Sequence, residues 1–248
     1  MSQFKGFISS NFEIKLADQE SEFLEIYKLR YEELLLCYNK GNANETGLFI
    51  DEYDRVCDHL IAVDLSNNTI AGTYRLVRKE HIKEIGMFTT EHEFDISKIK
   101  DYEILELGRA VVRNEYRNGG VIALLWRGIV KYVAIYGIRF MFGTASFFGI
   151  DPTPYRHALS KIYHNHLSPL EFRAVAINHP VRLNYFTPEE IDSKLARKEI
   201  PPLVKGYINL GATFGEGGFL DYDFNSLDVF TLIDMNTVNQ RYLERFLK

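Results

Sequence analysis

The sequence predicts an α/β (α+β) fold in which a central mixed sheet is flanked by helices. Three patterns lead to this fold class: an amphipathic segment near the start of the chain, a two-stranded hairpin, and a strand–turn–helix–strand run over residues 102–148. A helical crossover makes the two strands of that run parallel, whereas hairpin strands are antiparallel, so the sheet is mixed. The chain has no internal repeat and no linker-like tract, and we expect a single domain over residues 1–248.

The first expected elements are a helix and a hairpin. The helix is capped by Asp18, runs to about Cys37, and carries apolar side chains at helical spacing: Phe23, Ile26, Tyr27 and Leu34. A turn-rich segment follows over 39–44. Residues 59–65 and 69–77 are rich in apolar and β-branched side chains, and the polar turn Ser66-Asn67-Asn68 between them predicts a β-hairpin.

The central run begins with a strand over 102–112 whose nearly continuous apolar side chains predict burial on both faces. Apolar residues at three- and four-residue steps from Val121 to Tyr136 predict a helix that Gly137 ends, followed by a strand over 138–148. Asp151-Pro152 opens a short helix to His166, and another is expected over 188–198, ended by Pro201-Pro202. Residues 207–233 are β-rich with an expected turn at 215–218, and a closing helix is expected over 236–246.

The composition, with 46% hydrophobic and 25% charged residues in a chain of 248, is typical of a soluble globular protein and excludes fibrous and disordered classes. A formal net charge of −5 argues against a nucleic-acid partner, because binding to phosphates needs a basic surface. We expect a cytoplasmic location, since neither a signal peptide nor an apolar stretch of ~18 residues is present. Cys37 and Cys57 lack metal spacing, suit a reducing compartment, and are expected to be buried.

The glycine turn Arg117-Asn118-Gly119-Gly120, between the central strand and its helix, predicts a phosphate site. Such a turn directs backbone N–H groups and the positive end of the helix dipole at one point. The turn has neither the Lys-Ser or Lys-Thr pair of a nucleoside-triphosphate P-loop nor the G-x-G-x-x-G spacing of a dinucleotide site. A tight turn without a ligand is the alternative interpretation.

A basic strip surrounds this turn, with a local excess of +5 in an acidic protein. Only Glu115 opposes six basic residues: Arg109, Arg113, Arg117, Arg127, Lys131 and Arg139. An acidic carrier protein with a phosphopantetheine arm would suit the basic strip, because arginines attract its acidic surface and bind its phosphate. A solvated helix face is the alternative.

Two charged residues, Glu106 and Arg109, interrupt the apolar central strand. Strand alternation directs them to opposite faces, and each needs a partner because a buried charge is costly. Arg75 in the hairpin, and Asp51 and Asp54 shortly before it, are the candidate partners. A buried ion-pair network that only stabilises the fold is the alternative to an active site.

Several motifs resemble a known family. Arg117-x-x-Gly120-Val121 after a strand is similar to the pyrophosphate/pantetheine loop of the GCN5-related N-acyltransferase (GNAT) superfamily, with Ile122 where a small residue is usual. Other matches are Leu29-Arg30-Tyr31, Asp51-x-x-Asp54, Cys57-Asp58-His59-Leu60, Thr73-Tyr74-Arg75-Leu76, Glu106-Leu107-Gly108-Arg109, and residues 125–129, 142–147, 203–207 and 221–224. Together they resemble acyl-carrier-protein-dependent N-acyltransferases, and within these the bacterial L-ornithine N-α-acyltransferases (hemolysin-like), which are related to autoinducer synthases and N-acyl amino acid synthases.

This resemblance implies a GNAT-like fold with splayed parallel strands and a family-specific extension over 168–248 packed on the core. It implies transfer of a 3-hydroxy fatty acyl group from acyl carrier protein to the α-amine of L-ornithine, which forms lyso-ornithine lipid. No permanently bound cofactor is implied, because the phosphopantetheine arm is a co-substrate, with coenzyme A as the other candidate donor. The lipid product points to peripheral contact with the inner membrane.

The reaction needs a base for the amine proton and donors for the oxyanion. We expect Glu106 to accept the proton. Four further charged residues complete the catalytic set. Arg75 and Arg109 are expected to order the acidic side chains or to bind the carboxylate of the amino acid. Asp51 or Asp54 is expected to meet a cationic side chain. Seven residues are expected to contact the acyl donor. Backbone N–H groups of Ala110, Val111 and Val112 are expected to bind the thioester carbonyl. The glycine turn is expected to bind the phosphopantetheine through Arg117, Gly119, Gly120 and Val121.

Other functions remain open at this point. They are acylation of another acceptor such as glycine, an acetyl-coenzyme A-dependent acetyltransferase, an autoinducer synthase that uses S-adenosylmethionine, and a non-enzymatic carrier-protein or acyl-chain binding module. No metal site is expected, because His157, His164 and His166 do not share one helix face. Phe142, Phe147 and Phe148 are expected to line an acyl tunnel.

Overall fold

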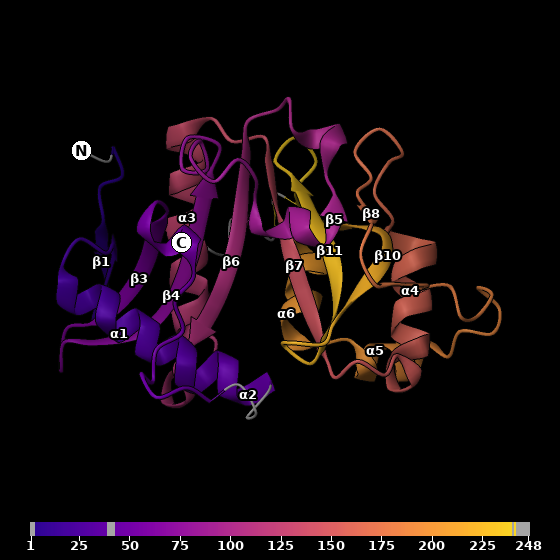
Figure 1. Ribbon diagram of the computed structural model, residues 1–248, viewed down its shortest axis with the longest axis horizontal. Coiled ribbons are helices and arrows are strands. Elements are labelled where there is room, and N and C mark those ends of the chain that lie inside the picture. Colours follow the sequence, from indigo (N-terminus) through magenta and orange to yellow (C-terminus); the bar gives the residue numbers. More distant parts are fainter. Residues whose placement is uncertain (1–2, 39–42, 240, 242–248) are drawn as a thin grey trace. The chain divides into compact units, whose positions relative to one another are not determined.

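A computed structural model describes residues 3–38, 43–239 and 241. Within this range the chain forms two compact units (Figure 1). The first unit contains residues 3–38, 43–86 and 105–138, and the second contains 87–104 and 139–239. The prediction of a single domain with an extension over 168–248 stays a prediction.

The first unit is built on an antiparallel sheet in the order β1-β2-β3-β4-β6. Its strands are β1 (Phe7–Ser9), β2 (Phe12–Leu16), β3 (Asp58–Asp64), β4 (Thr69–Arg78) and β6 (Ile104–Val112). Its helical segments are α1 (Glu20–Arg30), the π-helical turn η1 (Tyr31–Leu35), α2 (Leu36–Tyr38), the 3-10 turns η3 (Glu52–Arg55) and η6 (Asn114–Tyr116), and α3 (Gly120–Tyr136).

Helices α1 and α3 cover opposite faces of this sheet (Figure 1). Ile26 and Leu29 of α1 pack on Ile61 and its neighbours in the sheet. Residues of α3 pack on the other face, where Gly128 lies against Leu60. Residue alternation along β3 therefore decides which helix each side chain meets.

The second unit has a mixed sheet in the order β7-β11-β10-β8-β5, with β9 on β10. The pairing of β10 with β8 is parallel, and the other pairings are antiparallel. Its strands are β5 (Phe94–Asp95), β7 (Phe140–Phe148), β8 (Val175–Ala176), β9 (Pro180–Val181), β10 (Thr213–Asp221) and β11 (Ser226–Asp234). Its helical segments are η4 (Thr89–His92), η5 (Ser97–Ile99), η7 (Thr153–Tyr155), α4 (Arg156–His166), α5 (Ser193–Glu199) and α6 (Pro202–Leu210).

Most predicted elements are confirmed within a few residues. The hairpin is β3–β4, and the elements of the central run are β6, α3 and β7. Gly137 ends α3 in the left-handed conformation, as its position predicts. The first helix begins one residue later than expected: Gln19 is the N-cap, because the Glu22 carboxylate accepts the Gln19 N–H while the Asp18 carboxylate binds Lys15.

The C-terminal prediction is wrong in three places, and one of them is residues 207–210, which are expected to be β-rich but lie in helix α6. Pro201-Pro202 begins helix α6 rather than only ending the one before it, since proline suits the first helical turn. Residues 215–218 lie within β10 as an irregularity and form no chain reversal. A side chain at Gly215 would come within 2.9 Å of Phe230 Cβ, so this glycine allows two strands to pack closely. The reversal lies at Tyr222–Asn225, where Asn225 has a positive φ of 58°.

The chain contains further features that the sequence did not indicate. The β1–β2 hairpin and the short strands β5, β8 and β9 were not expected, because strands of two to five residues give little periodicity. Most of the expected turn over 39–44 lies outside the described residues, and so does most of the closing helix expected over 236–246. Its first residues are not helical, because 236 and 237 form a turn and 238 a bend. Cys37 is exposed and Cys57 half-buried, contrary to the expected burial. No helix of the described part has the length and apolar content needed to cross a membrane.

Candidate active site

Two aspartates and two arginines predicted for the site lie together in the first unit. Asp51 is the N-cap of the short turn η3, and Asp54 lies within it. Asp51 Oδ1 accepts the Tyr53 N–H at 3.0 Å and Asp54 Oδ2 accepts the Asp51 N–H at 2.9 Å, so the D-x-x-D motif folds its own turn. Arg75 comes to this turn from the middle of β4.

Asp51 lies between two arginines. Arg75 Nη1 donates to both of its carboxylate oxygens at 2.6 Å, and Arg109 Nη2 donates to Oδ2 at 2.9 Å. Burial alone would raise the pKa of Asp51, but the charges of Arg75 and Arg109 outweigh it and hold that pKa well below its ordinary value. The carboxylate therefore stays ionised throughout the neutral range and fixes both guanidinium groups.

Asp54 and Arg30 form the most deeply buried ion pair of the site. Arg30 Nη1 donates to Asp54 Oδ1 at 2.6 Å, and both side chains are almost fully buried. Arg75 Nη1 lies 3.4 Å from the same oxygen. Burial lowers the pKa of Arg30, and the Asp54 charge opposes this effect. Asp54 thus joins Arg30 to the Arg75–Asp51–Arg109 group.

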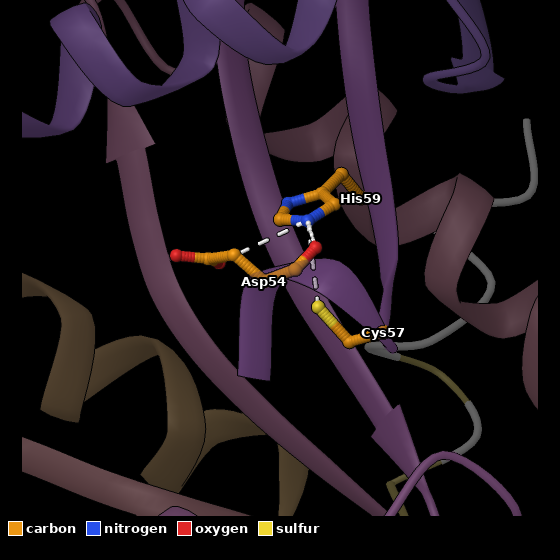
Figure 2. Close-up of side chains that lie close together, drawn as sticks. All are labelled: Asp54, Cys57 and His59. Atoms are coloured by element: carbon orange, nitrogen blue, oxygen red, sulfur yellow. Dashed lines mark hydrogen bonds and ion pairs between the residues drawn. The ribbon is translucent and has the colours of Figure 1, made fainter. Parts of the chain in front are cut away.

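His59 of β3 lies beside Asp54 and Cys57 (Figure 2) and also contacts Arg30. Its Nδ1 lies 2.9 Å from Arg30 Nη2, which can only donate, and its Nε2 lies 3.1 Å from the Asp54 carbonyl oxygen, which can only accept. The ring is therefore the neutral tautomer with its proton on Nε2. Burial, together with the nearby Arg30 charge, lowers the pKa of His59 from 6.5 to about 4.

Asp54, Cys57 and His59 lie close enough together to suggest a metal site or a cysteine–histidine pair. The bonds of His59 and Asp54 oppose both. A metal ion would face the guanidinium groups of Arg30 and Arg75, which already hold the Asp54 carboxylate. Burial raises the pKa of Cys57 to about 12, and the His59 Nε2 that lies 3.4 Å from Sγ carries a proton, so the thiol has no base.

Glu106 is buried on β6, 3% exposed, and shares a sheet face with Arg75. The register sets Val77 opposite Glu106 and Arg75 opposite Gly108, so Glu106 and Arg75 are diagonal neighbours. The Arg75 guanidinium lies 5.3 Å from the centre of the Tyr53 ring. Burial and the Glu106 charge raise the pKa of Tyr53 to about 12, which keeps its hydroxyl protonated. The Glu106 and Arg75 side chains thus project from neighbouring positions on one face of the sheet.

Glu106 and Arg109 were predicted to point to opposite faces of the strand, but a bulge in β6 interrupts the alternation between them. Between the pairs Thr73↔Val111 and Arg75↔Gly108, β6 has one residue more than β4. Arg109 lies in this bulge with a φ of 50°, a left-handed conformation that is strained for arginine. The bulge brings its guanidinium to the same carboxylate that Arg75 holds, and 4.5 Å from the centre of the Phe49 ring.

The glycine turn has the expected geometry for a helix N-terminus. Gly119 is the N-cap with a φ of 92°, which a side chain would strain, and Asn118 Oδ1 accepts the Gly120 N–H at 3.0 Å. Arg117 is held by Glu33 at 2.7 Å and by the Val112 carbonyl at 2.9 Å. The first turn of α3, which begins with Gly120 and Val121, contains no acidic residue and would accept a phosphate group.

The predicted oxyanion donors lie on β6 just after the bulge. Val111 and Val112 are opposite Thr73 and Gly72 of β4. Ala110 is half-buried beside them. Their role at the thioester carbonyl stays a prediction.

The histidine and phenylalanine groups of the second unit do not form common sites. His157 Nδ1 accepts the Asp192 N–H and its ring stacks on Phe186, whereas His164 Nε2 lies 2.9 Å from the Phe186 carbonyl oxygen; His166 lies near Phe214. The expected tunnel lining is wrong as a set, because alternation along β7 puts Phe142 and Phe148 on one face and Phe147 on the other.

Two residues of the network, Arg30 and His59, had no role assigned from the sequence. The signal for Arg30 was present: it follows Ile26 and Leu29 at helical spacing and so lies on the buried side of α1. His59 lies in a hairpin strand and in the Cys57-Asp58-His59-Leu60 motif that resembles the family, but neither feature indicates what its ring does.

Comparison with known proteins shows the family to which the chain belongs. A family model described as an acetyltransferase (GNAT) domain matches residues 29–127. The L-ornithine N(alpha)-acyltransferase of Rhodobacter capsulatus is 32% identical over 250 residues, which cover 96% of this chain and 95% of that protein. Its namesake from Agrobacterium fabrum is 34% identical over 247 residues, covering 94% and 84%. The solved AHL synthase LasI shares the fold, with a TM-score of 0.51 at 12% identity and 95% of each chain covered. The chain therefore belongs to the family of L-ornithine N(alpha)-acyltransferases.

Proposed function

We propose that this protein transfers a 3-hydroxy fatty acyl group from acyl carrier protein to the α-amine of L-ornithine, forming lyso-ornithine lipid. In this step the amine nitrogen forms an amide bond to the acyl carbon, the carbon–sulfur bond of the thioester breaks, and the thiol leaves with a proton. Family membership supports the reaction, and the observation that carries the site is the buried Glu106 beside the Arg75–Asp51–Arg109 group.

Glu106 is the residue we assign to accept the amine proton. A buried carboxylate on a rigid central strand is held in one position, which general base catalysis needs. Arg109 is partly exposed and carries a positive charge, so it suits the carboxylate of the amino acid. Asp51 and Asp54 are both bound by guanidinium groups, which favours a positioning role for them over direct contact with the acceptor's ammonium.

We assign the binding site of the acyl donor to the N-terminus of α3 and to the strand before it. The Val121 N–H, the Gly120 N–H once it leaves Asn118 Oδ1, and the dipole of a 17-residue helix would bind the phosphate of the phosphopantetheine arm. Coenzyme A carries the same arm and is the competing donor. We further propose that the protein works in the cytoplasm and contacts the inner membrane peripherally, since its product has an acyl chain.

The test is an acyl-transfer assay with purified protein. 3-Hydroxyacyl carrier protein or the matching acyl-coenzyme A is supplied with ornithine, glycine or lysine, and mass spectrometry identifies the N-acyl product. We expect N-acyl ornithine, with carrier protein as the better donor. Glu106→Gln should lower kcat by about 10²-fold or more, while Glu103→Gln, an exposed neighbour, should leave kcat unchanged.

Two results would contradict the proposal in different ways. Failure of the wild-type protein to acylate ornithine from either donor would remove the function. Full turnover by a normally folded Glu106→Gln protein would keep the function but make Glu106 structural. Expression in a bacterium that lacks aminolipids, followed by lipid mass spectrometry, gives the independent check on acceptor and chain length.

A further inference from the structure

One carboxylate, that of Glu33, holds the segment between β6 and α3 at two points. Glu33 lies in the π-helical turn η1. Its Oε1 accepts the Asn114 N–H at 3.2 Å, and its Oε2 accepts a hydrogen bond from Arg117 Nη2 at 2.7 Å. Asn114 begins the turn η6, and Arg117 directly follows that turn. Residues 81 and 84 positions apart in the sequence thus meet here, within the first unit.

The contact with Glu33 also fixes the Arg117 guanidinium. Arg117 Nε donates to the Val112 carbonyl oxygen at 2.9 Å, so the guanidinium is held by the end of β6 as well as by η1. Its Nη1 forms no hydrogen bond within the described part of the chain, and the side chain is 45% exposed. Arg117 can therefore bind a phosphate through Nη1 without leaving Glu33.

Tyr116 ties the same segment to another part of the first unit. Its hydroxyl donates to Asp64 Oδ2 at 3.0 Å and accepts from Asn67 Nδ2 at 3.2 Å. Asp64 is the last residue of β3, and Asn67 lies in the turn of the β3–β4 hairpin. Glu33 and Tyr116 therefore fix the segment to two different elements, just before Gly119, the N-cap of α3. Such fixed neighbours hold a binding group in a single geometry.

We propose that Glu33 is a positioning residue for the acyl donor, which holds Arg117 and the N-terminus of α3 in the geometry that binds the donor's phosphate. This inference rests on the proposed function, which assigns that phosphate to the first turn of α3. Charge alone would argue against a glutamate at this place, because a carboxylate repels a phosphate. The ion pair of Glu33 with Arg117 is partly exposed, and such pairs add little stability. The two hydrogen bonds therefore account for Glu33 better than its charge or its effect on stability does.

The test compares binding of phosphopantetheine with binding of pantetheine, which lacks the phosphate. Calorimetric titration gives both Kd values, and the Kd of pantetheine divided by that of phosphopantetheine measures the phosphate preference. We expect Glu33→Ala to lower this preference by about 5–10-fold, with the Kd of pantetheine unchanged. Glu33→Gln, which keeps one acceptor oxygen, should lower it less. In the transfer assay, Glu33→Ala should raise the KM for the acyl donor and leave kcat unchanged. Glu32→Ala, which alters an exposed glutamate of the same turn, is the matched control and should change neither.

The binding and transfer assays separate failure of this inference from failure of the proposed function. A wild-type protein that binds both probes equally has no phosphate site at α3, which overturns the inference whether or not ornithine is acylated. The inference is also overturned if Glu33→Ala and Glu33→Gln keep or increase the phosphate preference at the wild-type melting temperature. If Glu33→Ala does not fold, Glu33→Gln alone decides. If the wild-type protein acylates no amino acid but Glu33→Ala still lowers the phosphate preference, the proposed function fails and the positioning role stands.

Discussion

Six side chains are connected through the first unit, a neutral histidine and five charged groups of alternating sign. In order of contact they are His59, Arg30, Asp54, Arg75, Asp51 and Arg109. A buried ion pair adds little to the stability of a protein, because both charges lose their hydration. Removing one partner destabilises the protein, because the other charge is then buried without a partner. The network is therefore best explained by what it positions: it holds Arg109 and Arg75, the diagonal neighbour of Glu106, in a single geometry.

His59 makes part of this network dependent on pH. Burial and the Arg30 charge lower its pKa from 6.5 to about 4, so the folded protein keeps the ring neutral where the unfolded chain would protonate it. Protons then bind the unfolded state more strongly, and the free energy of unfolding falls as pH drops from 6.5 towards 4, by about 3 kcal/mol in total. Urea unfolding at several pH values measures this loss.

The matched variant is His59→Gln, whose amide can accept from Arg30 and donate to the Asp54 carbonyl without titrating. We expect its unfolding free energy to change less between pH 6.5 and 4 than that of the wild-type protein. His81 and His166, whose pKa values are also lowered by burial, titrate in both proteins and cancel in the comparison. Parallel curves for the two proteins would show that His59 is not the responsible group.

At the scale of elements, close packing of α3 on β4 depends on Gly72. A Cβ at this position would lie 2.9 Å from the Val111 carbonyl oxygen and 3.0 Å from Val121 Cγ1, so both β6 and α3 would have to move. We expect Gly72→Ala to lower the free energy of unfolding by about 2–3 kcal/mol. The same movement would displace the bulge at Arg109, so kcat/KM should fall as well.

Gly206 provides the opposite case within helix α6. Nothing lies within 4 Å of a Cβ built there, so Gly206→Ala should raise the free energy of unfolding by about 0.5–1 kcal/mol through helix propensity. Urea unfolding of both variants tests the pair. A Gly72→Ala protein as stable as Gly206→Ala would mean that β6 and α3 adjust at little cost.

At the scale of the whole molecule, the basic strip is less basic in the structure than in the sequence. Arg109, Arg113, Arg117 and Arg139 each form an ion pair, with Asp51, Glu25, Glu33 and Asp234 respectively. Arg127 and Lys131 have no carboxylate partner within the described part of the chain. Both lie over the Phe7 ring, at 4.9 and 4.1 Å from its centre. These two residues on one side of α3 remain available to an acidic partner.

The double variant Arg127→Glu, Lys131→Glu should therefore weaken use of acyl carrier protein. We expect kcat/KM for the carrier-bound donor to fall about 10-fold at low ionic strength and less at high salt, because the attraction is screened. The matched control is Lys194→Glu, Lys198→Glu, two exposed lysines with the same spacing on α5. Equal losses with acyl-coenzyme A, or in the control, would exclude carrier docking on this part of α3.

Much of the fold follows from the sequence because its longer elements carry strong periodicity. The hairpin β3–β4, strand β6, helix α3 and strand β7 were predictable from apolar spacing and from glycine and asparagine turns. The charged residues of the site were also predictable, because charged side chains within an apolar strand need partners of opposite charge. The short strands and helix α6 were not, because their few residues are placed by tertiary contacts that override local propensity.

The sequence by itself determined the family, the fold class and the set Glu106, Arg109, Arg75, Asp51 and Asp54 as charged groups that had to be accommodated. Only the tertiary structure decided how they connect. The bulge that brings Arg109 to Asp51, the burial that keeps His59 neutral, and the meeting of Glu33 with Asn114 and Arg117 all depend on register between segments far apart in the chain. Register is set by packing of whole faces, so no local pattern contains it.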